Sequence, residues 1–217
     1  MQVCLASTSP ARLALLNQAG IEPLPLAPEV DEEAVIADIE RQEGRTLPAD
    51  EHVLVLARRK AADVAGRVLE VLPDFDGIVV GGDSMFELDG EILGKPYTPE
   101  AATARWQAMR GRTGVLHSGH AVIRVRAGAG DRPEAHAVAR ASVSFAADVT
   151  DAEIAAYVGT GEPLLVAGAF TVDSLGAPFI ERVEGDPSTV VGMSLSTIRR
   201  LARELGVEWT DLWNRIP

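Results

Sequence analysis

The chain of 217 residues lacks several features that would assign it to a class of protein. It has one cysteine, Cys4, which excludes an internal disulfide and predicts a small buried thiol in a reducing compartment. No apolar run approaches the roughly 20 residues that cross a bilayer. The N-terminus has no basic and apolar segment of the kind typical of a signal peptide. We therefore expect a cytoplasmic protein without a membrane partner.

Positive charge is also scarce. The chain carries 20 Lys and Arg against 32 Asp and Glu, a formal net charge of -12. Because a nucleic acid polymer requires a basic surface, it is excluded as a partner, and any bound anion must be held by a few local cations. The four histidines show no metal-ligand spacing and no Cys–His pair, and both a Walker motif and a dinucleotide-binding glycine motif are missing.

Apolar runs and capping residues predict one domain over residues 1–217, in which strands and helices interleave. We expect strands at 3–6, 77–82, 115–125, 136–146 and within 178–183. We expect helices at 10–19, 31–45 and 53–72, and others starting at 99, 151 and 195. A hairpin over 86–93 that turns at Asp89-Gly90 excludes a purely parallel sheet. The fold class is therefore α/β, with a mixed β-sheet flanked by helices.

The segment LASTSPARLALL (5–16) places hydroxyl groups where a strand passes into a helix. Ser9 is the natural N-cap and Pro10 the natural first helical residue. A helix N-terminus offers unsatisfied N–H groups and a partial positive charge, which suit a phosphate that Arg12 and the hydroxyl of Ser7 could also contact. The alternative is that the motif only caps a helix and that Arg12 is a solvated surface charge.

The segment GGDSMFELDGEILGKP (81–96) surrounds one aspartate and one lysine with glycines. Asp83 ends an apolar strand, and ligands of open α/β sheets gather at the carboxyl ends of strands. If residues 89 and 90 form a two-residue turn, then Ser84 pairs with Lys95 across the hairpin. The direction of the Asp83 side chain stays open. The alternative is a hairpin edge that carries charges for solubility, which leaves the glycines unexplained.

Three further charged residues stand where a cleft could use them. Lys60 is four residues from both Leu56 and Val64, so it belongs to the buried stripe of its helix and either snorkels to the surface or serves a cleft. Glu32 lies in an acidic run that otherwise marks only a solvated helix start. Arg112 follows a helix and could simply complement its C-terminal dipole.

Taken in order, these motifs resemble the Maf family, known as septum formation inhibitors and as nucleoside triphosphate pyrophosphatases. The resemblance runs from residue 5 to residue 195 and is carried by LASTSPARLALL, EVDEE, LARRKAADVA, VVGGDSMFELDGEILGKP, MRGRTGVLHSG, VAGAFTVDSLG and ERVEGDPSTVVGMSL. It implies a two-lobed fold around a nucleotide cleft, similar to inosine triphosphate pyrophosphatases. It also implies hydrolysis of a nucleoside triphosphate to the monophosphate and pyrophosphate, a house-cleaning role, a divalent cation (Mg²⁺ or Mn²⁺) and a possible homodimer.

The resemblance also implies roles for individual residues. Asp83 would be the general base that activates water, and Asp83 and Glu32 would bind the metal. Substrate binding would fall to a set of polar side chains: Ser7, Ser9 and Arg12 at the helix start, Lys60 and Lys95 against the phosphoryl oxygens, and Ser84, Arg112 and Asp173. This logic suits phosphoryl transfer, which depends on positioning and on cations near shared negative charge.

Departures from the family pattern bear on the substrate. Ala11 stands in place of the first of two arginines, which removes a phosphate contact, and Gly114 stands where a histidine is frequent. The branch acting on thymidine and uridine triphosphates has a glutamine where this chain has Asp173. An ionised aspartate only accepts hydrogen bonds, which suits the N–H donors of guanine. This loop looks closer to the branch acting on 7-methylguanosine triphosphate.

Two other functions stay open at this point. A non-catalytic nucleotide-binding regulator of cell division would have no use for a carboxylate at position 83 beside a triphosphate. A general phosphatase would release inorganic phosphate in place of pyrophosphate, so the identity of the product distinguishes it.

Overall fold

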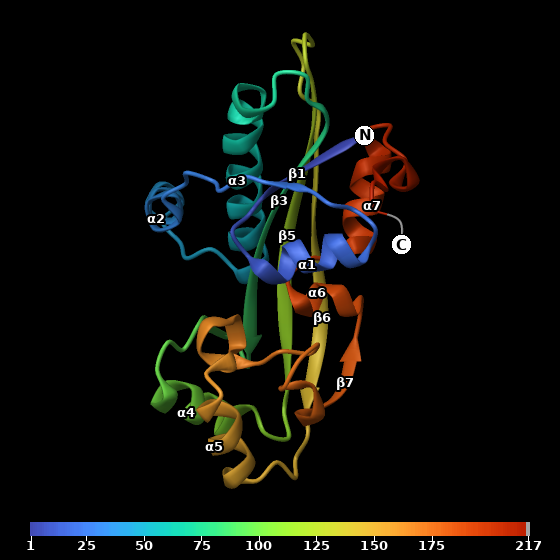
Figure 1. Cartoon of the computed structure of the whole chain (residues 1–217). Helices are drawn as coiled ribbons and strands as arrows, with labels where there is room; N and C mark the ends of the chain where they lie inside the picture. Colours follow the sequence, from blue (N-terminus) through green and yellow to red (C-terminus); the bar gives the residue numbers. More distant parts are fainter. Residues whose placement is uncertain (216–217) are drawn as a thin grey trace. The chain divides into compact units, whose positions relative to one another are not determined.

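The computed structural model describes residues 1–215, whose strands form one mixed sheet flanked by helices (Figure 1). The strands are β1 (Gln2–Ala6), β2 (Leu24–Pro25), β3 (Asp76–Leu88), β4 (Glu91–Leu93), β5 (Thr113–Arg126), β6 (Glu134–Phe145) and β7 (Ile180–Glu184). The helices are α1 (Pro10–Gln18), α2 (Glu32–Glu43), α3 (Ala49–Val71), α4 (Pro99–Met109), α5 (Asp151–Gly159), α6 (Pro187–Val191) and α7 (Leu195–Glu204). Short 3-10 helices are η1 (Glu162–Leu165), η2 (Ala167–Ala169), η3 (Ala177–Phe179) and η4 (Trp209–Leu212).

The sheet has the strand order β2-β1-β3-β5-β6-β7, with β4 paired to β3. Strand β1 is parallel to β2 and β3, whereas β4 is antiparallel to β3 and β7 is antiparallel to β6. The predicted α/β class with a mixed sheet is therefore confirmed. The five-residue helix α6 was not predicted, because five residues are too few to show a helical period.

The hairpin between β3 and β4 turns as predicted. Asp89 and Gly90 both have positive φ angles, 49° and 85°, as a two-residue type I′ turn requires. Leu88 pairs with Glu91, which is the predicted register. The ladder nevertheless ends at Leu93, so the prediction that Ser84 pairs with Lys95 is wrong. The chain leaves β3 there because the Gly94 carbonyl accepts hydrogen bonds from Arg105 and from the Gly168 N–H.

The chain divides into two compact units. Unit 1 comprises residues 1–83, 118–139 and those from 192 onward, and unit 2 comprises residues 84–117 and 140–191. Strands β3, β5 and β6 contribute residues to both. The prediction of one domain over the whole chain with two lobes stays a prediction.

The core of unit 1 lies where α3 packs against β1 and β3 (Figure 1). Small side chains such as Ala57 and Ala61 face the sheet and let the helix approach it closely. Cys4 on β1 is fully buried in this core, and burial raises the pKa of its thiol to about 11. Among the described residues, no helix is both long and apolar enough to cross a membrane.

The core of unit 2 is aromatic. Trp106 on α4 meets Phe145 edge to face with ring centroids 5.5 Å apart, and Phe86 meets Phe170 at 5.0 Å. Such pairs stabilise a core by about 0.5–1.5 kcal/mol beyond the burial of their area. The indole N–H of Trp106 donates to the Ala169 carbonyl at 2.7 Å. The core therefore also fixes the end of η2.

Candidate active site

A buried lysine joins two carboxylates in unit 1. The ammonium of Lys60 on α3 lies 2.7 Å from Oδ1 of Asp83 on β3 and 2.9 Å from Oε1 of Glu32 on α2. The Lys60 side chain is 7% exposed, that of Asp83 14%, and that of Glu32 48%. The sequence left the direction of Asp83 open, and the structure turns its carboxylate to α3. Three predicted site residues are thus brought together.

This pair forms because α3 lies unusually close to β3. A Cβ at Gly81 would stand 2.3 Å from the Ala57 carbonyl oxygen and 2.8 Å from the Ala61 Cβ, so only glycine fits there. Lys60 follows on the same buried face of α3, as its position between Leu56 and Val64 predicted. Gly81 therefore sets the distance at which Lys60 reaches Asp83.

Arg12 is fixed beside the same strand. Ser9 caps α1 as predicted, with its hydroxyl oxygen 3.5 Å from the Arg12 backbone nitrogen. The Arg12 side chain donates from Nη1 to Ser7 Oγ at 3.2 Å and from Nε to the Gly192 carbonyl at 2.8 Å. A Cβ on Gly82 would lie 3.4 Å from Nε, so the guanidinium packs against β3 next to Asp83.

The surroundings of Arg12 differ from those of a solvated surface charge, which was the alternative at the sequence level. Burial lowers the pKa of the Arg12 guanidinium, while the charges of Asp83 and Glu32 act in the opposite direction. Two carboxylates and two cations, Lys60 and Arg12, therefore balance one another within unit 1. Buried ion pairs cost desolvation energy, so stability alone does not account for this cluster.

Buried polar residues that the sequence did not single out support this cluster. The Ser118 hydroxyl lies 3.3 Å from both the Asp83 and Gly192 carbonyl oxygens, and it can donate to either one. His120 is fully buried, and its Nε2 accepts the Ser194 N–H at 2.8 Å. Ser118 and Ser194 lie within segments that carry the family resemblance, but no spacing links them to Asp83, because they come from β5 and from the start of α7, far from residue 83 in the chain.

Asp83 and Glu32 are the predicted metal ligands, and their chemistry can be compared with what a divalent cation requires. Asp83 and Glu32 offer hard carboxylate oxygens on either side of one ammonium. Residues 1–215 contain no group of three or more His, Cys, Asp or Glu that could hold a metal. Mg²⁺ typically takes one or two carboxylates and completes its shell with water and substrate phosphates. The donor set therefore fits a cation shared with a phosphorylated ligand, and it does not fit a closed site made of protein alone.

The other predicted residues belong to unit 2. Ser84 is half-buried, whereas Lys95, Arg112 and Asp173 are exposed. Arg112 forms an ion pair with Asp89 and donates to the Ala108 carbonyl at 3.3 Å. Because Ala108 lies in the last turn of α4, this contact matches the alternative role at a helix C-terminus. A role for Arg112 in substrate binding stays a prediction.

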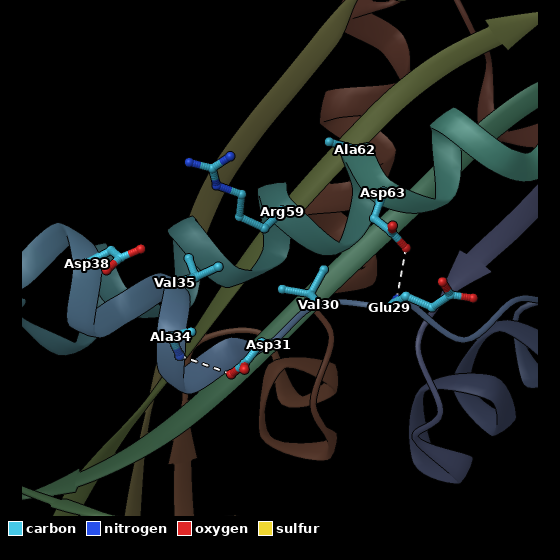
Figure 2. A pocket seen from close by; sticks show the side chains of 9 residues that line it. All are labelled: Glu29, Val30, Asp31, Ala34, Val35, Asp38, Arg59, Ala62 and Asp63. Carbon is cyan, nitrogen blue, oxygen red and sulfur yellow. Dashed lines mark hydrogen bonds between the residues drawn. The ribbon is translucent and has the colours of Figure 1, made fainter.

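A separate pocket of about 410 Å³ lies between α2 and α3 (Figure 2). Acidic residues and one arginine line it: Glu29, Asp31, Asp38, Asp63 and Arg59, with Val30, Ala34, Val35 and Ala62 between them. The dashed lines in Figure 2 show Asp63 accepting the Glu29 N–H and Asp31 accepting the Ala34 N–H. None of the predicted site residues lines this pocket.

Comparison with known proteins now complements this geometry. The model of the family described as "Maf-like protein" matches residues 2–205. The chain belongs to this family. A curated relative from Leifsonia xyli, named nucleoside triphosphate pyrophosphatase, is 60% identical over 99% of this chain and 98% of its own. Another with the same name, from Salinispora tropica, is 52% identical over 99% of this chain and 88% of its own.

A solved structure of a nucleoside-triphosphatase / dITP/XTP pyrophosphatase from Mycobacterium abscessus is more distant. It is 14% identical over 95% of this chain and 93% of its own, with a TM-score of 0.34. That likeness is too low to bear on fold or function, so the implied similarity to inosine triphosphate pyrophosphatases stays a prediction.

Proposed function

We propose that this Maf-like protein hydrolyses a nucleoside triphosphate to the monophosphate and pyrophosphate, with Asp83 as the general base. The observation that carries the proposal is the buried Lys60–Asp83 pair, 2.7 Å apart, beside the start of α1. The names of the curated relatives support the same reaction. The prediction that Asp83 ends its strand is wrong, because β3 continues to Leu88, but a carboxylate that an ammonium orients still suits the activation of water.

The reaction assigns work to both parts of the cluster. Lys60 holds one oxygen of the Asp83 carboxylate, so the carboxylate keeps one orientation while it accepts a proton from the attacking water. The start of α1, with Ser7, Ser9 and Arg12, would bind phosphate through its N–H groups and the guanidinium. Arg12 is already oriented by its bonds to Ser7 and Gly192, which reduces the cost of ordering it on binding.

Asp83 and Glu32 are the residues that would hold a divalent cation. When bound, such a cation polarises phosphoryl oxygens and favours deprotonation of water. The Lys60 ammonium contacts both carboxylates and has three N–H donors, so it can keep Asp83 oriented and also donate to a phosphoryl oxygen. In unit 2, Ser84, Lys95 and Arg112 are the further residues proposed to contact substrate.

The nucleobase is proposed from Asp173. Its side chain is exposed on the loop that follows the aromatic core of unit 2. As an ionised acceptor it favours a base that presents N–H donors on its pairing edge, as guanine does through N1–H and its N2 amine. We therefore propose 7-methylguanosine triphosphate or a related guanine nucleotide as the preferred substrate, ahead of thymidine and uridine triphosphates.

Product analysis tests the reaction. Purified protein, Mn²⁺ and a panel of nucleoside triphosphates are assayed for pyrophosphate and monophosphate, beside Asp83→Asn and the control Asp76→Asn. Asp76 lies on the same strand but pairs with Arg124, so its variant should keep turnover. We expect Asp83→Asn to lose about 10²–10⁴-fold in kcat/KM.

Three results would contradict the proposal in different ways. Release of inorganic phosphate alone would indicate a general phosphatase. Binding of triphosphates without turnover would favour a regulatory protein and make Asp83 structural. A preference for thymidine triphosphate in the wild type, or the same preference in wild type and Asp173→Gln, would leave the reaction standing and exclude the proposed base.

A further inference from the structure

The carboxylate of Glu162, at the start of η1, is the acceptor of an extensive hydrogen-bond network in unit 2. Oε1 accepts from Tyr157 Oη at 3.0 Å, from the Gly176 N–H at 3.2 Å and from the Thr171 hydroxyl. Oε2 accepts from Ser174 Oγ at 2.7 Å and from the Leu175 N–H at 3.3 Å. Four of the five donors belong to the loop 171–176, which carries Asp173.

These bonds keep Glu162 ionised. Burial acts to raise the pKa of its carboxyl, but the hydrogen bonds from Thr171, Ser174 and Tyr157 outweigh burial and lower it below the usual value. Burial also raises the pKa of the Tyr157 phenol, so that side chain stays a donor. The Glu162 carboxylate thus accepts five hydrogen bonds from neutral donors, which is more than the capping of a helix requires.

The loop closes tightly around this carboxylate. A Cβ at Gly176 would stand 2.6 Å from the Thr171 carbonyl oxygen and 2.7 Å from the Tyr157 hydroxyl, so the backbone there has little room to shift. Loops of exposed polar residues are otherwise mobile, because few contacts offset their conformational entropy. Here the bonds to Glu162 supply those contacts on both sides of Asp173.

The residues that directly follow Glu162, in η1 and η2, also form hydrogen bonds with the chain on either side of Lys95. The Leu164 carbonyl accepts the Tyr97 N–H at 3.0 Å, and the Gly168 N–H donates to the Gly94 carbonyl at 3.3 Å. Glu162 therefore stands at the joint between two segments that carry predicted substrate-binding residues.

We infer that Glu162 is a positioning residue that fixes the loop 171–176 so that Asp173 meets the nucleobase of the substrate. The inference rests on the proposed function. Loss of this anchor weakens recognition of the base while the reacting groups are unchanged. The effect therefore falls on KM and on the choice among bases, and kcat for the preferred substrate is retained.

Glu162→Gln tests the inference, with Glu153→Gln as the matched control. Glu153 is also in unit 2 and also accepts a threonine hydroxyl and a backbone N–H, but its partner is Thr150 at the start of α5. For Glu162→Gln we expect KM for the preferred triphosphate to rise about tenfold, with a smaller difference between bases, because a charge-assisted anchor is lost. Hydrogen exchange at the Leu175 and Gly176 amides should accelerate in this variant and not in the control.

Unchanged KM and base preference in Glu162→Gln would overturn the inference, as would equal losses in both variants that follow the fraction of folded protein. If Glu162→Gln does not fold, Ser174→Ala removes one donor to the same carboxylate and should shift KM in the same direction by a smaller factor. No shift would then overturn the inference. A wild type that produces no pyrophosphate would refute the proposed function and this inference together, whereas an active wild type separates the two.

Discussion

The Lys60 cluster of unit 1 and the Glu162 network of unit 2 are two polar centres that are built in opposite ways. In unit 1, charge is balanced by charge, since Asp83 and Glu32 share the ammonium of Lys60, and Arg12 lies beside them. In unit 2, the single carboxylate of Glu162 is balanced by neutral hydroxyl and N–H donors. The first arrangement can pass its charges to a ligand, and the second cannot.

This difference suggests different roles: the Lys60 cluster suits the reaction itself, and the Glu162 network suits the positioning of a loop. An ion pair between buried side chains costs desolvation energy, and removing one partner leaves an uncompensated buried charge. A carboxylate that accepts several neutral hydrogen bonds gains stability without offering any exchangeable charge. We therefore expect substitutions in unit 1 to change chemistry and stability together, and substitutions around Glu162 to change recognition.

The largest effect on stability should come from Lys60→Met. It leaves the Asp83 and Glu32 carboxylates without their shared cation, and breaking a buried pair costs about 3–5 kcal/mol. Because Glu32 is half exposed, we expect the lower end of that range in the free energy of unfolding, measured in urea. The matched control is Arg58→Met on the same helix. Arg58 pairs with Glu134 in solvent, and such pairs stabilise by less than about 1 kcal/mol.

A double variant sharpens this result. Lys60→Met with Asp83→Asn removes the cation and one of its carboxylates, so it should be more stable than Lys60→Met alone. If the second substitution adds its full cost to the first, the two side chains are not energetically coupled, and the contrast between the two centres fails.

Much of unit 1 could be predicted from its sequence because its signals are periodic or local. The position of Lys60 on the buried stripe and the Ser9 cap each depend on a short spacing, as does the type I′ turn at Asp89-Gly90 in unit 2. The contact between Lys60 and Asp83 could not be predicted in the same way. It depends on how closely α3 approaches β3, which Gly81 decides through a contact with residues of another element.

The centre in unit 2 left no comparable signal. Glu162 and its donors Thr171, Ser174 and Gly176 lie in short 3-10 helices and loops, where no period links an acceptor to its donors. The sequence drew attention to Asp173 through its family resemblance, but nothing pointed to the residue that holds its loop. Networks of irregular backbone become visible only in three dimensions.

A smaller loss of stability is expected for Gly81→Ala. The added Cβ would stand 2.3 Å from the Ala57 carbonyl oxygen, so α3 must move away from β3, and overpacking of this kind costs about 1–3 kcal/mol. The same movement separates Lys60 from Asp83, so turnover should fall as well.

The control is Gly66→Ala on α3. A Cβ at Gly66 would have nothing within 4 Å, so this substitution should stabilise the helix by about 0.5–1 kcal/mol. Equal stability of the two variants would show that the close approach is not required.

The smallest effect concerns pH and belongs to unit 2. Hydrogen bonds from Thr171, Ser174 and Tyr157 outweigh burial and hold the pKa of Glu162 below its ordinary value. A depressed pKa in the folded state contributes stability above the unfolded-state value, and that contribution is lost as the pH falls through the folded-state value. Between pH 7 and pH 6, therefore, the ionisation of Glu162 gives no pH dependence of stability.

Below about pH 4.5, the stability of the wild type should decline more steeply than that of Glu162→Gln, which has no proton to bind. Urea unfolding of both proteins at a series of acid pH values measures the two slopes. Parallel slopes would mean that Glu162 binds its proton equally well in the folded and unfolded chains, and its network of neutral donors would then not favour the ionised carboxylate.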